Sequence, residues 1–247
     1  MPRNVRRSSC ILSCVAYSLA FAGLIQTCGI SFGQSLKFVP PIYNVPLSSS
    51  HLLNNPAGMA VDAHGTVYIV DTGHSQVWKI DAFEQTSLFA GTGSAAYTGD
   101  NGLAADAALN APLAVTVDLA GNVFIADAGN HAVRRVDAVT GVITTFAGGN
   151  GNGDSGNNGL ATAAELESPA GLAVDAADNL YIADAGDAQI RKVQTNGVIL
   201  WYGGLGTPAT GNGDGGPATS AKFVTPGCLA LDAAGDQIGR ASCRERV

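Results

Sequence analysis

The chain repeats one phrase four times, as PAGMAVD (56–62), PLAVTVD (112–118), PAGLAVD (169–175) and PGCLALD (226–232). The prolines that open these phrases stand 56, 57 and 57 residues apart. A fixed period of this length, in units that each contain several short strands, is typical of repeat proteins in which every unit packs against its neighbours. The period therefore predicts a repeat array rather than one globular enzyme domain.

The third unit predicts four short strands separated by turns. They are AGLAVD (170–175), NLYIAD (179–184), AQIRKV (188–193) and VILWYGG (198–204). Alternating side chains and bounding turn residues are typical of strands joined by hairpins. The first and second units repeat the same four runs in the same order. Each complete unit is therefore expected to form one four-stranded sheet.

The second strand of the third unit is apolar on both faces. Because successive side chains of a strand alternate, Leu180 and Ile182 lie on one face and Tyr181 and Ala183 on the other. Burial of a Leu or Ile side chain stabilises a fold by roughly 1.5–3 kcal/mol, so both faces need a cover. Sheets stacked around an axis provide it. The sequence thus predicts an all-β fold, a β-propeller with four-stranded blades.

Glycine-rich loops join the predicted blades at 91–112, 148–169 and 204–226. Their Gly, Asn and Asp residues predict tight turns with positive φ. The segments LAADAAL and LATAAEL within the first two loops hold enough alanine for one helical turn. Since the insertion recurs at the same place, we expect each loop to be capped by a short helix.

The repeated patterns P-x-G-[LM]-A-V-D and [NT]-[LV]-[YF]-I-[AV]-D-x-G-[NHD], followed by [QRV]-[VI]-x-[RK]-[VI], resemble NHL repeats. The resemblance covers residues 56–236. It extends to a bacterial secreted subtype with GDGGPAT inter-blade loops, a motif written in full at 213–219. It implies a six-bladed, TolB-like ring in which the first strand of each blade lines a central channel. It implies no single activity.

The repeat also divides the chain. We expect a signal peptide at 1–33, an N-terminal linker or closing strand at 34–55, the propeller at 56–236 and a non-native or artefactual tail at 237–247, where the repeat pattern is broken. The blades are predicted at 56–111, 112–168 and 169–225, with a partial blade at 226–236. Six blades at this period need about 340 residues, so the sequence predicts a C-terminally truncated ring. The competing prediction is a ring closed by two three-bladed chains.

The N-terminus has the pattern of a secretory leader. Arg3, Arg6 and Arg7 precede an apolar stretch at 11–25, and small residues precede Gln34. This pattern predicts a bacterial protein that is secreted, periplasmic or on the cell surface. No integral membrane segment is expected after cleavage, because no comparable apolar run follows.

The predicted mature body is strongly acidic. Residues 34–239 hold seven basic and nineteen acidic side chains, a net charge of −12, against −7 for the whole chain. A surface of this sign repels phosphate backbones. Nucleic-acid binding is therefore not expected.

Aspartates close the first two strands of each unit and could form a ring that holds a metal. They are Asp62, Asp118, Asp175 and Asp232 in the first strands, and Asp71, Asp127 and Asp184 in the second strands. Because Asp before a turn accepts backbone N–H bonds, and because a catalytic group needs no copy in every blade, we interpret them as structural.

Calcium is the cofactor that the loops could hold, with Asp100, Asp154 and Asp214 as candidate ligands, since carboxylate and carbonyl oxygens suit a hard cation. Four histidines are present, but His74 and His131 are offset by one position in the repeat and do not predict equivalent zinc ligands. No catalytic residue and no other cofactor site is predicted.

These features favour a non-catalytic protein that binds a protein or glycan through its loops, because the loops vary between units while the strands do not. The alternative is an enzyme of the lactonase or lyase type found among six-bladed propellers, with its active-site residues mostly in missing blades. A third possibility is a structural spacer within a larger surface protein.

Overall fold

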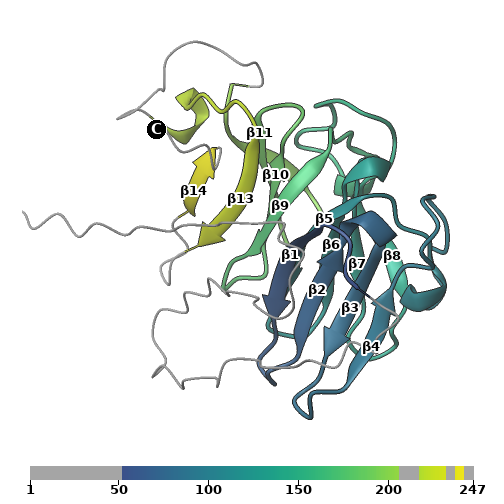
Figure 1. Cartoon of the computed structure of the whole chain (residues 1–247). Coiled ribbons are helices and arrows are strands. Elements are labelled where there is room, and N and C mark those ends of the chain that lie inside the picture. The colour runs from purple at the N-terminus through teal and green to yellow at the C-terminus, as the bar shows by residue number, and fades with distance from the viewer. Residues whose placement is uncertain (1–51, 206–216, 232–236, 242–247) are drawn as a thin grey trace, which may run out of the picture. The chain divides into compact units, whose positions relative to one another are not determined.

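Each of the first three repeats folds as one four-stranded antiparallel sheet (Figure 1). The computed structural model describes residues 52–205, 217–231 and 237–241. The predicted signal peptide at 1–33, most of the predicted linker at 34–55 and most of the GDGGPAT motif lie outside these residues. No helix in the described residues is long and apolar enough to span a membrane.

The strands follow one another in chain order within each sheet. Blade 1 contains β1 (Pro56–Val61), β2 (Val67–Asp71), β3 (Gln76–Ile80) and β4 (Thr86–Ala90). Blade 2 contains β5 (Pro112–Val117), β6 (Val123–Asp127), β7 (Ala132–Val136) and β8 (Ile143–Gly148). Blade 3 contains β9 (Pro169–Val174), β10 (Leu180–Asp184), β11 (Gln189–Val193) and β12 (Ile199–Gly203).

A fourth sheet pairs β13 (Pro226–Leu231) with β14 (Gln237–Ala241). The two strands are antiparallel, and Leu231 lies opposite Gln237. The sequence pattern predicts no strand at 237–241. The backbone nevertheless forms β14 here, in the position that the second strand has in the other blades. The origin of the segment 237–247 stays a prediction.

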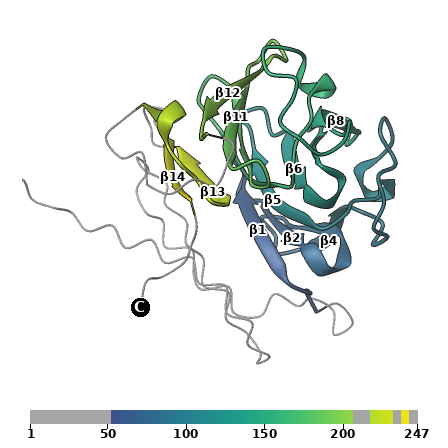
Figure 2. The ribbon, with the colours of Figure 1, turned by 90° about the horizontal axis from the view of Figure 1, so that it is seen from above.

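The blades pack through their first strands and their faces. β5 contacts both β1 and β9, and β9 contacts β13, so the first strands of successive sheets are neighbours. Figure 2 shows the sheets in chain order from above. In β10, Leu180 and Ile182 pack toward blade 2, while Tyr181 and Ala183 pack toward β13. Both faces of this strand are therefore buried, which confirms the prediction from its alternating apolar residues.

Each inter-blade loop ends in a single helical turn, as the alanine-rich segments predict. These 3-10 turns are η2 (Ala104–Asp106), η4 (Ala161–Ala163) and η5 (Ala218–Ser220). Leu109 and Leu166 follow the first two turns and are fully buried between successive blades. The loops are thus anchored in the core rather than attached loosely to it.

In each blade, the turn between the second and third strands lies at the same end as the inter-blade loop that precedes the blade. Equivalent hydrogen bonds join them, from Gly129 N to Asn110 O at 2.9 Å and from Gly186 N to Glu167 O at 2.7 Å. The intervening turns include the 3-10 turns η1 (Thr72–His74) and η3 (Ala128–Asn130). We call this end, made of the loops at 91–111 and 149–168 with the turns at 71–76, 127–132 and 184–189, the loop end.

Candidate binding site at the loop end of blade 3

The aspartates that close the second strands join each blade to the loop before it. In every blade the Asp Oδ1 accepts a hydrogen bond of 2.7 Å from a backbone N–H seventeen residues earlier in the chain. The pairs are Asn54 N to Asp71, Asn110 N to Asp127 and Glu167 N to Asp184. This repeated bond supports the structural interpretation of these aspartates.

The aspartates after the first strands also accept hydrogen bonds from backbone N–H groups, at the opposite end of the blades. Asp62 Oδ1 accepts backbone N–H bonds from His64 and Thr66, and Asp175 Oδ1 accepts them from Ala177 and Asn179. The predicted counterpart Asp232 lies outside the described residues. The two sets of aspartates therefore lie at opposite ends of the blades and form no common ring.

Blade 2 contains a fully buried arginine, Arg134, and each nitrogen of its guanidinium has a hydrogen-bond partner. The Arg134 side chain is 0% exposed, and its Nη2 lies 2.6 Å from Asp100 Oδ1, while its Nη1 lies 3.3 Å from Asp127 Oδ2. Asn130 Nδ2 donates to the same Asp127 oxygen at 2.9 Å. Burial raises the pKa of Asp127, and the hydrogen bonds from Asn110 and Asn130 and the charge of Arg134 oppose that rise. The buried charge pair is thus neutralised and hydrogen-bonded.

This arrangement gives Asp100, a predicted calcium ligand, a different role. Its Oδ1 is held by Arg134, and its Oδ2 accepts a hydrogen bond from Thr145 Oγ1 at 2.6 Å. Asp154 lies in the next loop and contacts Gln189, while Asp214 lies outside the described residues. Among the described residues, the predicted ligands Asp100 and Asp154 therefore belong to different loops and different networks.

Blade 3 repeats the buried arginine with weaker contacts. Arg191 is fully buried, but its Nη1 lies 3.7 Å from Asp184 Oδ2, beyond hydrogen-bond distance. The guanidinium instead donates to three loop carbonyls, of Asp154, Ser155 and Glu165, at 3.2–3.4 Å. No carboxylate in this loop takes the place that Asp100 has in blade 2, because the equivalent residue is Asn157.

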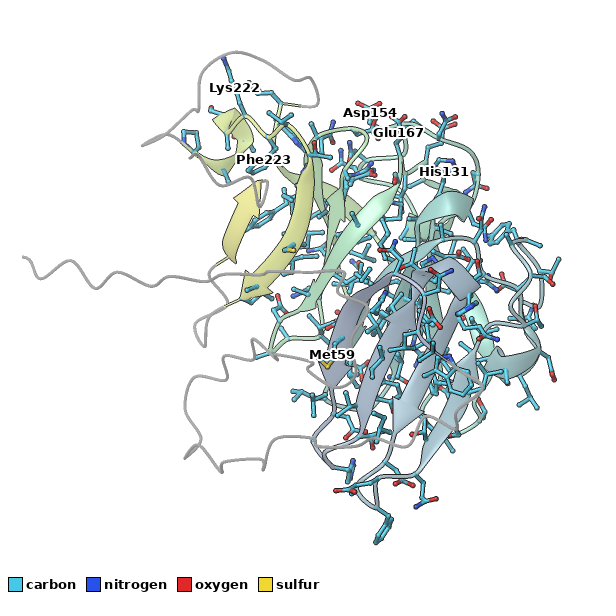
Figure 3. All side chains as sticks on the ribbon, in the orientation of Figure 1. Met59, His131, Asp154, Glu167, Lys222 and Phe223 are labelled. Carbon is cyan, nitrogen blue, oxygen red and sulfur yellow. The ribbon has the colours of Figure 1, made fainter. Side chains whose placement is uncertain are left out.

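Three other loop-end positions gain a carboxyl group in blade 3. The equivalent pairs, blade 2 residue first, are Tyr97 and Asp154, Asn110 and Glu167, and Asn130 and Asp187. With Asp184 they form what we call the acidic cluster: Asp154, Glu167, Asp184 and Asp187. The charges of Asp187 and Glu167 act on Asp184, and those of Glu167 and Asp154 act on Asp187, so the four carboxyl groups belong to one electrostatic network. Figure 3 shows Asp154 and Glu167 at the loop end.

Several polar atoms of this region have no hydrogen-bond partner. They are Oδ2 of Asp184, Oδ2 of Asp187, Oε1 of Gln189 and Nε of Arg191. Burial, followed by the charge of Asp187, raises the pKa of Asp184 to about 8. Burial, followed by the charges of Glu167 and Asp154, raises the pKa of Asp187 to about 6. The cluster therefore holds more carboxyl groups than ionise together at neutral pH beside the single charge of Arg191.

Sequence reasoning identified Asp154 and missed Glu167 and Asp187 as a possible binding group. The signal was present in the repeat itself, because aligning the units on their prolines shows a carboxylate replacing a neutral residue at each of three positions. No three His, Cys, Asp or Glu side chains in the described residues already converge on one point as in a preformed metal site.

The histidines occupy separate places in the structure. His74 Nδ1 lies 2.8 Å from Asp71 Oδ2, and the ring of His131 accepts a bond of 3.3 Å from the Ser168 N–H. His64 lies in an exposed turn, and His51 lies outside the described residues. The prediction that His74 and His131 are not equivalent ligands agrees with these different surroundings.

The acidic cluster predicts a pH dependence of stability. Asp184 and Asp187 have folded pKa values above the ordinary carboxyl value, so the folded state binds more protons than the unfolded state between about pH 4 and pH 8. We expect the Tm in metal-free buffer to fall as the pH rises from 5 to 8. The groups that face these carboxyls are Asp154, Glu167 and Arg191.

Differential scanning fluorimetry at several pH values measures this effect. The variant Asp187→Asn, which introduces the residue of blade 2, should show a smaller fall in Tm over the same range. Asp137 and Asp175 have lowered pKa values and act below about pH 4, outside this window. A Tm that rises from pH 5 to 8, or an equal fall in the variant, would contradict the prediction.

The NHL repeat family model matches residues 53–80, which contain β1, β2 and β3. Protein SUPPRESSOR OF QUENCHING 1, chloroplastic, of Arabidopsis thaliana is 31% identical over 137 residues, which cover 52% of this chain and 13% of that protein. Teneurin-1 of Mus musculus is 34% identical over 140 residues, which cover 48% of this chain and 5% of that protein. The chain thus spans a small part of the length of these curated relatives.

Solved structures resemble the fold. A protein of unknown function from Bacteroides thetaiotaomicron has a TM-score of 0.58 and 19% identity, over 75% of this chain and 44% of that chain. An auxiliary nutrient binding protein from Bacteroides ovatus has a TM-score of 0.52 and 19% identity, over 72% and 43%. A streptogramin B lyase has a TM-score of 0.51 and 13% identity, over 78% and 50%. At these identities the likeness shows the fold alone.

The fold and the family match define a class. The chain is an all-β repeat protein with an NHL repeat and four-stranded, propeller-like blades. The GDGGPAT subtype, the closure of six blades and the C-terminal truncation stay predictions.

Proposed function

We propose that this chain is a non-catalytic binding scaffold, secreted to the periplasm or cell surface of a bacterium, that binds a protein or glycan at its loop end. One observation carries the proposal. The bond that joins each second-strand Asp to the preceding loop has the same length in all three blades, while the loop-end side chains around it differ from blade to blade. A constant framework with variable loops is the usual arrangement for recognition on a propeller.

The exposed side chains of the loops suit such a role. Tyr97, in the loop before blade 2, is 41% exposed. Tyr and Trp are enriched at binding surfaces because they combine a large apolar area with a polar group. The acidic cluster adds negative charge to the same end, which favours a ligand with basic or hydroxyl groups over a nucleic acid.

The structural neighbours do not separate binding from catalysis, because a nutrient binding protein and a lyase resemble this fold to a similar degree. A lactonase or lyase activity does not need its catalytic groups to be repeated in every blade. Within the described residues, blade 3 has three carboxyl groups that blade 2 lacks at the equivalent positions, those of Asp154, Glu167 and Asp187.

Loop exchange tests the proposal. Residues 151–158 are replaced by the equivalent residues 94–101, and binding is measured on a printed glycan array and with a phage-displayed peptide library. We expect the wild-type chain to bind a defined subset of probes and the exchanged variant to lose that subset while its circular dichroism spectrum is unchanged. The control exchanges the opposite-end turn 176–178 for the equivalent residues 119–121 and should keep binding. Loss of binding in the control alone would contradict the proposal.

A further inference from the structure

We infer that the acidic cluster of blade 3 binds one hard divalent cation, with the properties of Ca²⁺, through Asp187 and Glu167 together with the side-chain oxygen of Gln189. This inference does not rest on the proposed partner, since it concerns a site within one blade. It differs from the calcium ligands that the sequence predicts, because Asp100 is held by Arg134 and only Asp154 belongs to the cluster.

The charge balance of equivalent positions supports a divalent cation. In blade 2, two carboxyl groups, Asp100 and Asp127, face the single guanidinium of Arg134. In blade 3, the charges of Asp184, Asp187 and Asp154 act on the single guanidinium of Arg191, and Glu167 acts on Asp184 and Asp187. Blade 3 therefore has two more carboxyl groups than blade 2 beside a single guanidinium, and one divalent cation would balance the charge of two carboxylates.

Two buried residues in this region have a side-chain oxygen without a hydrogen-bond partner. Asp184 is 0% exposed and Gln189 is 6% exposed, yet Asp184 Oδ2 and Gln189 Oε1 have no hydrogen-bond partner. Gln189 Nε2 lies 3.3 Å from Asp154 Oδ2, so the amide lies beside the cluster. Leaving such buried atoms unpaired destabilises the fold, because they lose their bonds to water without gaining a partner. The equivalent Asp127 oxygen in blade 2 has partners in Asn130 and Arg134.

The position of Arg191 explains which side the cation occupies. Its guanidinium binds the carbonyls of the preceding loop on the buried side. Glu167 and Asp187 are half-buried and Asp154 is exposed, so the outer side of the cluster is open to solvent. The Glu167 side chain lies against Gly186, where a Cβ would clash with it, so the β10–β11 turn gives this carboxylate room.

Calcium suits these donors. Ca²⁺ takes six to eight oxygen ligands in flexible geometry and accepts amide oxygens, carbonyls and water beside carboxylates. Two adjacent carboxylates and one amide oxygen are therefore sufficient protein donors, even though no three acidic groups of the described residues converge in advance. Mg²⁺ demands near-ideal octahedral geometry and keeps its water, so it should bind more weakly.

Calorimetric titration of the chelator-treated full chain with CaCl₂ at pH 7.5 tests the site. We expect one site per chain with a Kd on the order of 10⁻⁴–10⁻³ M, as in extracellular calcium modules, and a Tm that rises with calcium. The double variant Glu167→Asn and Asp187→Asn introduces the residues of blade 2 and should weaken binding at least tenfold. The single variant Asp187→Asn should weaken it in the same direction.

The matched control is Asp106→Asn, which removes an exposed carboxylate from the equivalent loop of blade 2 and should leave binding unchanged. Circular dichroism verifies that each variant is folded. The inference is overturned by no saturable binding up to about 10 mM calcium, tenfold above that range, or by equal binding in the wild type and the double variant. It is also overturned if an ammonium salt, and not calcium, raises the Tm, since the cluster would then accept a cationic side chain.

Discussion

Replacing Asp127 with alanine is expected to lower the free energy of unfolding by about 3–5 kcal/mol, the cost of removing one partner from a buried ion pair. Asp127 and Arg134 are both 0% exposed, so the guanidinium would keep Asp100 as its one carboxylate partner, beside the carbonyls of Thr98 and Ala108. The change also removes the acceptor for the Asn110 N–H, a bond of 2.7 Å that joins blade 2 to the preceding loop. With the bond from Asn130 Nδ2, three stabilising contacts are therefore lost together.

Chemical denaturation followed by circular dichroism measures this loss. Asp127→Asn keeps an oxygen acceptor but removes the charge, and should cost less than the alanine variant. Asp106→Ala, at an exposed position of the loop, should change the free energy by no more than about 0.5 kcal/mol. A cost below about 1 kcal/mol for Asp127→Ala would mean that the buried pair contributes nothing beyond a surface ion pair.

Replacing Leu166 with alanine is expected to cost about 2–5 kcal/mol, because the deletion of a fully buried leucine leaves a cavity. Leu166 is 0% exposed and packs between blades 2 and 3 with Val133, Leu180 and Ile182. It also follows the helical turn η4, so it anchors the loop that provides Asp154. The same variant should therefore weaken calcium binding indirectly, by loosening the loop.

The repeat provides an internal comparison for this prediction. Leu109 occupies the equivalent place between blades 1 and 2 and is also 0% exposed, so Leu109→Ala should cost the same within about 1 kcal/mol. Leu109→Ala should leave calcium binding unchanged, because the loop that it anchors holds Asp100 and not the acidic cluster. Val139→Ala, at a position 93% exposed, should have no measurable effect on stability. Equal, small effects at Leu166 and Leu109 would show that the loops are not anchored by these side chains.

Much of the fold could be predicted because its signals are local and periodic. The spacing of the prolines, the alternation of Leu180 to Ala183 and the alanines before Leu109 each report on a strand, a face or a turn within one repeat. The strand β14 was not predicted, because the residues at 237–241 carry no alternating pattern and their pairing with β13 is a property of the backbone.

The candidate site was less predictable, because its residues are far apart in the chain. Asp154 and Glu167 lie at the two ends of one loop, and Asp187 lies in a turn of the next sheet. A single carboxylate in a Gly-rich loop looks the same in sequence whether it ion-pairs with an arginine, as Asp100 does, or faces other acids, as Asp154 does. Only the arrangement of the blades distinguishes these two cases.

The sequence by itself determined the repeat, the four-stranded blades and the need for each blade to be covered on both faces, because a period and an alternation constrain every unit in the same way. The tertiary structure alone decided which charges meet. Buried electrostatics depends on separations of a few ångströms between side chains from different loops, and a one-dimensional pattern does not contain those distances. In blade 2 these distances complete a buried ion pair, and in blade 3 they leave carboxyl groups facing one another.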